Sequence, residues 1–185
     1  ATAATGLASN FRKDIRLEGL KYLQVSYTGG KPLPPISVLA KMTGEPNNGK
    51  QVFLKTCSTC HQLGNEGQPF GPALTQIGNK LTKDALYIAI IHPDNGINFG
   101  YEGYVIKMKD GNVVAGIIAS ETEDALEVML PGGIKKRYEK AQVQSRKIMD
   151  NSMMPSNLHQ LMNQQELVNL VEYLHAQQSS QVSKQ

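Results

Sequence analysis

The chain has 185 residues, of which 40% are hydrophobic and 19% are charged, and its net charge is +3. This length and composition are typical of an ordinary globular protein that can bury one good core. No apolar run is long enough to span a membrane, and no segment is basic enough to indicate a nucleic-acid partner.

The first part of the chain predicts helices that need a partner. In residues 6–27, apolar side chains recur at spacings of three to five with charged side chains between them, which predicts an amphipathic helix. Glycines and prolines in residues 29–35 end it, and residues 36–42 form a short second helix. We interpret residues 1–45 as an N-terminal helical extension or linker. It is either the end of an upstream helical unit or a strap over the next domain, residues 46–185.

The next predicted helix begins near Gly49, where Asn47 or Asn48 can cap it. A glycine within a helix costs about 1 kcal/mol relative to alanine, so Gly49 indicates that another backbone passes close to it. The expected partner is the last helix, which Asn163 or Gln164 opens.

Directly after the helix that contains Gly49, the sequence reads Cys57-Ser58-Thr59-Cys60-His61. Two cysteines separated by two residues and followed at once by a histidine form the attachment sequence of a c-type haem. On a helix, Cys57 and Cys60 lie one turn apart on the same face, so each can form a thioether bond with one porphyrin. His61 is then the natural proximal ligand of the iron. We predict one covalently bound haem c.

Two other readings of these cysteines are weaker. A structural zinc site needs about four ligands, and His61, His92, His159 or His175 would have to complete it without a second paired spacing. A thioredoxin-like redox pair belongs near a strand and at the start of a helix, whereas this pair follows a helical run.

Glycines and prolines between residues 64 and 72 predict an irregular loop, after which Leu74 and Ile77 turn the chain back toward the porphyrin. Thr82 is the expected N-cap of a helix over residues 83–91. Residues 101–147 then alternate apolar and polar side chains around tight turns, which predicts hairpins. We expect a small antiparallel sheet with strands at residues 104–109, 113–119, 126–130 and 134–138.

The open face of the iron needs a second ligand. Met154 is preferred because Pro155 restricts its backbone to extended geometry, and Met153 is the fallback. The alternative is that these methionines only fill the core. Met149 and Met162 lack a following proline, and His92, His159 or His175 would give a bis-histidine site instead.

From about residue 47 to residue 178 the chain resembles class I cytochrome c. The resemblance rests on the haem motif after a first helix, the run Gly71-Pro72-Ala73-Leu74, the Met-Pro pair and a terminal helix. It implies that the first and last helices cross. Gly49 and Phe53 of the first helix would then meet Leu170 and Tyr173 of the last. It also implies that Pro72 and Leu74 belong to the haem pocket, where the Pro72 carbonyl fixes His61.

The expected fold is mainly α, a class I cytochrome c-like helical fold with a small antiparallel β-sheet inserted before the methionine loop, at about residues 101–147. With this insertion, the chain resembles the haem-binding domain at the C-termini of large exported proteins of planctomycetes and their relatives. There such a domain follows helical repeats or a propeller, which fits the orphan helix at residues 6–27.

The expected function is one-electron transfer without enzymatic activity. An iron held by His61 and Met154 has no vacant position for a substrate, and no acid, base or nucleophile constellation stands out elsewhere. We expect a dehydrogenase as donor, a cytochrome or oxidase as acceptor, and oligomerisation through the sheet as a possibility. A peroxidase or gas-binding haem, or a redox-sensing docking module, is the alternative.

The expected location is the periplasm or another exported compartment, because covalent haem attachment is normally completed outside the bacterial cytoplasm. No leader is visible at Ala1, so we expect either that a leader has been removed or that the sequence is a piece of a longer exported chain. We favour the second, because the domains that it resembles stand at the C-termini of larger proteins.

Overall fold

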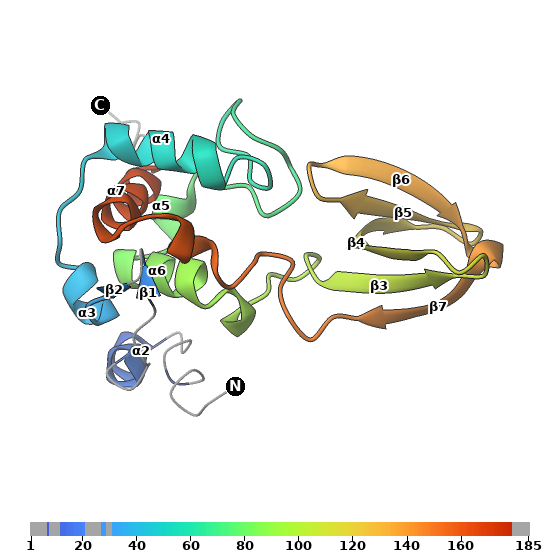
Figure 1. Ribbon diagram of the computed structural model, residues 1–185, viewed down its shortest axis with the longest axis horizontal. Helices are drawn as coiled ribbons and strands as arrows, with labels where there is room; N and C mark the ends of the chain where they lie inside the picture. The colour runs from blue at the N-terminus through green and yellow to red at the C-terminus, as the bar shows by residue number, and fades with distance from the viewer. Residues whose placement is uncertain (1–6, 8–11, 21–26, 29–30, 179–185) are drawn as a thin grey trace, which may run out of the picture.

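The computed structural model describes residue 7 and residues 12–20, 27–28 and 31–178. They form a helical body and a five-stranded antiparallel sheet, which lie next to each other along the longest axis of the molecule (Figure 1). Two segments connect the two parts, one entering the first strand of the sheet and one leaving its last strand (Figure 1). In the part of the chain that is described, no helix is both long and apolar enough to cross a membrane.

The N-terminal segment contains less helix than the sequence predicts. Helix α2 covers Lys13–Leu20, and the remaining positions of the predicted helix up to residue 26, apart from residues 7 and 12, lie outside the described residues. Strand β1 (Tyr27–Thr28) pairs with β2 (Lys31–Pro32), so the assignment of Tyr27 to a helix is wrong. A short helix, α3, follows at Ile36–Leu39.

Helices α4 (Pro46–Thr56) and α7 (Gln164–His175) cross at a glycine, as predicted. A Cβ atom added to Gly49 would lie 2.0 Å from the backbone oxygen of Asn169 in α7. One turn further on, the rings of Phe53 and Tyr173 pack with their centroids 5.9 Å apart. The missing side chain at Gly49 therefore lets the two backbones touch. This close approach explains why a glycine stands within α4 although glycine disfavours helix formation.

The N-terminus of α4 differs from the prediction. Its N-cap is Glu45, which makes no side-chain capping bond, and Pro46 occupies the first turn. Proline suits that position because its missing N–H would have no partner within the helix. The expected caps, Asn47 and Asn48, are therefore already inside the helix.

The main core lies in the helical body. Helix α5 (Ile77–Lys80) contacts α7, while α6 (Lys83–Ile91) packs against α3 and α7. The short turns η1 (Pro93–Asn95) and η3 (Leu158–Leu161) adjoin α6. Among the described residues, the most completely buried side chains of this core are Leu39, Phe53, Tyr87, Leu167, Val168, Leu170 and Val171.

The assignment of Asn163 as the N-cap of α7 can be tested by mutation. The Asn163 side chain accepts a hydrogen bond from the Glu166 backbone N–H at 2.9 Å, and the Glu166 carboxylate accepts one from the Asn163 N–H at 2.7 Å. We expect Asn163→Ala to lower the free energy of unfolding by about 1 kcal/mol, because it removes this capping box. Urea unfolding measures the loss. Thr82→Ala is the matched control, since the Thr82 N-cap of α6 makes no side-chain capping bond; equal losses in both variants would contradict the assignment.

The sheet consists of strands joined in the order β6-β5-β4-β3-β7. The strands are β3 (Gly103–Met108), β4 (Val113–Glu121), β5 (Ala125–Leu130), β6 (Ile134–Glu139) and β7 (Val143–Ile148). The first four follow one another as hairpins, and a 3-10 turn, η2 (Lys140–Gln142), carries the chain across to pair β7 with β3.

Each face of the sheet buries a different set of side chains. One face holds a small core of its own, made by Ile106, Met108, Leu126 and Val128. On the opposite face, Gly103, Ile117 and Met129 are direct neighbours across β3, β4 and β5. Ile117 and Met129 are buried against Phe70 of the helical body. The sheet is therefore packed against the helical body through this second face.

The predicted mainly α class is wrong. The sheet has five strands, and its own buried core makes it a substantial part of a fold that mixes α and β structure. The four predicted strands are present, but β7 was missed. All of its residues except Val143 are exposed, so this edge strand lacks the alternating apolar pattern that reveals a half-buried strand.

Candidate functional site

The motif Cys57–His61 lies on a turn that continues α4. The helix ends at Thr56, and the Cys57 N–H still donates to the Phe53 carbonyl at 2.8 Å. The N–H groups of Cys60 and His61 then both donate to the Cys57 carbonyl, at 3.0 and 2.9 Å. The motif thus follows the helix instead of lying within it, but these bonds keep the cysteines about one helical turn apart.

The two cysteines are free and half-buried, and each faces a different part of the protein. Cys57 packs against the main core, whereas Cys60 packs against the cluster formed by Phe70, Ile117 and Met129. We call this cluster, with Tyr101 and Met153 beside it, the junction cluster. It joins the attachment motif to the sheet.

The chemistry of the cysteines argues against a redox pair and against zinc. Burial raises the pKa of Cys57 and of Cys60, whereas a catalytic thiol pair needs a lowered pKa. Over the described ranges, no group of three or more His, Cys, Asp or Glu side chains is arranged to hold a metal ion. Neither alternative reading of the two cysteines is therefore supported by their surroundings in the described part of the chain.

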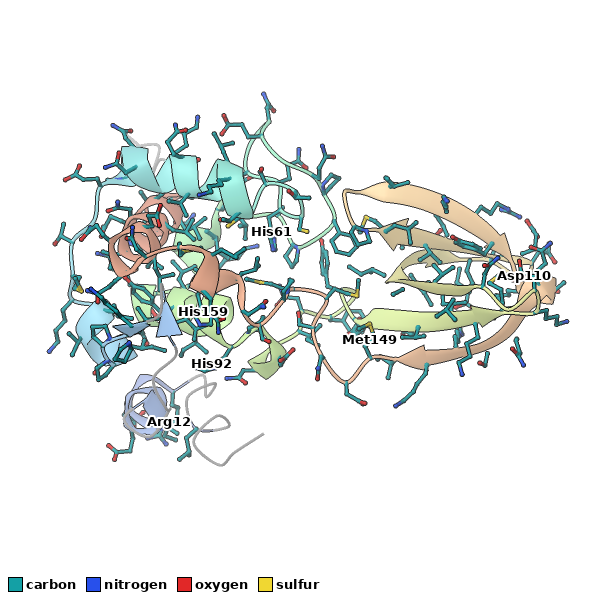
Figure 2. The ribbon with its side chains drawn as sticks, in the orientation of Figure 1. Arg12, His61, His92, Asp110, Met149 and His159 are labelled. Atoms are coloured by element: carbon teal, nitrogen blue, oxygen red, sulfur yellow. The ribbon has the colours of Figure 1, made fainter. Side chains whose placement is uncertain are left out.

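The imidazole of His61 is fixed by one hydrogen bond. Its Nδ1 atom lies 2.8 Å from the Pro72 carbonyl oxygen, and since a carbonyl can only accept, Nδ1 carries the proton and donates. This tautomer leaves a lone pair on Nε2. Burial lowers the pKa of His61, while the bond to Pro72 acts in the opposite direction. His61 is therefore a candidate nitrogen ligand, on the segment after α4 and on the side of the helical body that faces the sheet (Figure 2).

Two glycines leave room for this histidine. A Cβ atom at Gly71 would lie 2.6 Å from His61 Cε1 and 2.9 Å from Nδ1, so the backbone of Gly71 packs directly on the ring. Gly67 has a φ of +87°, and a Cβ atom there would lie 2.1 Å from the His61 carbonyl oxygen. The loop after the motif therefore forms a close cradle around His61.

The second candidate ligand lies in residues 149–155, which we call the methionine loop. Ser152 N–H donates to the Asp94 carboxylate of η1 at 2.7 Å, and Met154 N–H donates to the Ser152 hydroxyl at 3.1 Å. Met154 is half-buried and packs against the main core. Met153 packs against the Phe70, Ile117 and Met129 side chains of the junction cluster, as Cys60 does. The loop therefore brings one methionine to the core that holds Cys57 and the other to the cluster that holds Cys60.

The other candidates are placed differently. Met162 is buried in the main core, which accounts for it as a packing residue. Leu74 packs at the edge of that core, as Met154 does. His92 and His159 lie beside each other and apart from His61 (Figure 2), and burial lowers the pKa of both. His175 is the last residue of α7. These histidines are not gathered at the attachment motif.

Comparison with known families points to the same part of the chain. Residues 46–127 match the family model described as Cytochrome c. This segment resembles a class I cytochrome c. The match contains α4, the attachment motif, His61 and Pro72, and it ends within β5 of the sheet. It supports a haem-binding, electron-transfer protein of the cytochrome c type. No curated protein matches the chain significantly.

Sequence reasoning missed several residues that shape this site. The roles of Gly71 and Gly67 depend on what lies opposite them, although the motif around Pro72 already marked the loop. Asp94 and Ser152 are joined across 58 positions of sequence, which no local pattern reveals. The junction cluster likewise needs the sheet to be in place.

Proposed function

We propose that this protein transfers single electrons through one haem c bound covalently by Cys57 and Cys60, with His61 and Met154 as axial ligands. When bound, the haem supplies an iron that accepts and releases one electron. The observation that carries the proposal is the orientation of His61, whose half-buried ring is held through Nδ1 by the Pro72 carbonyl, with Nε2 left for a metal. Such a bond to the outer ring nitrogen is the usual support of a ligating histidine.

The residues present fit this group. The thiols of Cys57 and Cys60 follow each other at the spacing that haem attachment uses, and neither is committed to a disulfide. Met154 packs on the same core as Cys57, and its N–H is held by the Ser152 hydroxyl. A thioether ligand raises the reduction potential relative to a second histidine. Apolar side chains from the core and from the sheet would exclude water from this region.

We also propose the setting in which the electron moves. The donor would be a dehydrogenase, either separate or fused to this chain, and the acceptor another cytochrome or an oxidase. Contacts of this kind are small and transient. Because attachment of haem is completed outside the bacterial cytoplasm, the expected location is the periplasm or a similar exported compartment.

The test uses the matured protein and its Met154→Leu variant. We expect the wild type to keep its haem on a denaturing gel, and its ferrous form to bind carbon monoxide slowly, because the thioether must leave first. In Met154→Leu the sulfur–iron absorption band should vanish, the potential should fall, and carbon monoxide should bind about 100-fold faster or more.

Met153→Leu is the matched control, since it removes the neighbouring thioether and keeps the size of the side chain. It should retain the absorption band. Haem that separates from the chain on the gel would refute covalent attachment. An unchanged band in Met154→Leu, or rapid carbon monoxide binding in the wild type, would refute the proposed ligation and favour an enzyme or gas-binding protein.

A further inference from the structure

The sheet meets the methionine loop at Gly103, the first residue of β3. A Cβ atom added there would lie 2.8 Å from Met149 Sδ, 2.8 Å from Met153 Cγ and 2.9 Å from Met153 Sδ. Each of these distances is shorter than the closest approach of two non-bonded carbon atoms or of a carbon and a sulfur atom, so an added Cβ atom would force a neighbour to shift. Gly103 therefore leaves room for two methionine side chains that an alanine would displace.

Backbone conformation does not explain this glycine. Its φ is not positive, and the residue pairs regularly with Ile117 of β4, so any residue could adopt the same backbone. The strand also holds the start of the loop directly, since Met149 N–H donates to the Gly103 carbonyl at 2.8 Å. The space that Gly103 leaves open is filled by the loop itself.

Met153 is thus held from two sides. It contacts Gly103 on β3, and it packs against the junction cluster, which contains Cys60 of the attachment motif. The next residue, Met154, has its own N–H held by Ser152, whose N–H is in turn held by Asp94. A displacement of Met153 therefore passes to Met154 through one peptide unit, while Asp94 limits how far the loop can follow.

We propose that Gly103 is a positioning residue, through which the inserted sheet seats Met153 and thereby aims Met154 at the iron. The inference rests on the proposed ligation by Met154 and adds a role for the sheet in it. A sheet with a side chain at this position would push Met153 away from β3 and loosen the bond between sulfur and iron. The sheet then does more than cover the site, because it sets the geometry of the second ligand.

The experiment compares Gly103→Ala with Gly96→Ala in the matured protein. Gly96 has a φ of −162° and nothing within 4 Å of an added Cβ atom, so Gly96→Ala adds the same methyl group in open space. We expect Gly103→Ala to speed carbon monoxide binding to the ferrous protein about tenfold, to weaken the sulfur–iron band and to lower the potential. Gly96→Ala should match the wild type.

A double-mutant cycle with Met153→Ala tests the route. Once the Met153 side chain is absent, Gly103→Ala should accelerate carbon monoxide binding much less, because the added methyl group then meets only Met149, which is not the neighbour of Met154 in the chain. An equal effect of Gly103→Ala with and without the Met153 side chain would overturn the inference. So would a Gly103→Ala variant that behaves like Gly96→Ala.

Failure of the ligation can be told apart from failure of the positioning role. If Met154→Leu leaves the band intact, the proposed ligand is wrong whatever Gly103 does. If Met154→Leu abolishes the band but Gly103→Ala leaves it unchanged, only the positioning role is wrong. Hydrogen exchange gives a readout that does not depend on the ligand: the amides of Ser152 and Met154 should exchange faster in Gly103→Ala than in Gly96→Ala. Equal exchange rates would count against the inference.

Discussion

Gly49→Ala is expected to lower the free energy of unfolding by about 3 kcal/mol, although alanine is the better helix former. The added Cβ atom would lie 2.0 Å from Asn169 O and 2.6 Å from Asn169 C. These are backbone atoms of α7, so no side chain can rotate away and the two helices must separate. The separation would also disturb the packing of Phe53 on Tyr173. Urea or thermal unfolding measures the loss.

Gly96→Ala serves as the control for this effect too, because it adds the same methyl group in open space. Its unfolding free energy should stay within about 0.5 kcal/mol of the wild type. If Gly49→Ala were as stable as this control, or more stable, helix propensity would outweigh packing. The contact between α4 and α7 would then be looser than the structure shows.

Gly71→Ala should have the largest effect on the haem site. The new Cβ atom would overlap three atoms of the His61 ring, at 2.6, 2.9 and 3.0 Å. The Pro72 carbonyl accepts a hydrogen bond from Nδ1 of the same ring, so His61 cannot move without losing this bond. We expect the fraction of chains that carry ligated haem to fall about tenfold or more, as measured by haem absorbance per chain.

The variant should keep its helices, because Gly71 lies in a loop and its φ is not positive. Circular dichroism checks this point and separates a local effect from unfolding. Full haem content with an unaltered spectrum would show that Gly71 does not press on the ring. It would also weaken the role assigned to Pro72.

Local sequence patterns predicted much of the helical body. The glycine in α4 pointed to a close helix crossing, and Asn163, one of the two predicted caps, is the N-cap of α7. The alternating runs between residues 104 and 138 gave four strands of the sheet. These predictions succeeded because each element depends on residues within a few positions of one another, where capping, turns and periodicity act.

The predictions that failed depended on longer-range packing. The fold class was wrong because the predicted small insertion is a five-stranded sheet with a buried core of its own, and its edge strand β7 is stabilised by pairing with β3. Tyr27 fits a helical spacing but pairs with Pro32 in a small ribbon. Asn47 and Asn48 have the chemistry of helix caps, yet Pro46 begins the helix and the N-cap is Glu45, two residues before Asn47.

The sequence by itself determined the candidate attachment motif, because Cys57, Cys60 and His61 lie within five consecutive positions and their spacing needs only one turn of backbone. The tertiary structure decided what surrounds them. Contacts between Ser152 and Asp94 and between Gly103 and Met153 join segments that lie far apart along the chain. Such contacts depend on how whole elements pack, and a linear pattern does not encode which surfaces will meet.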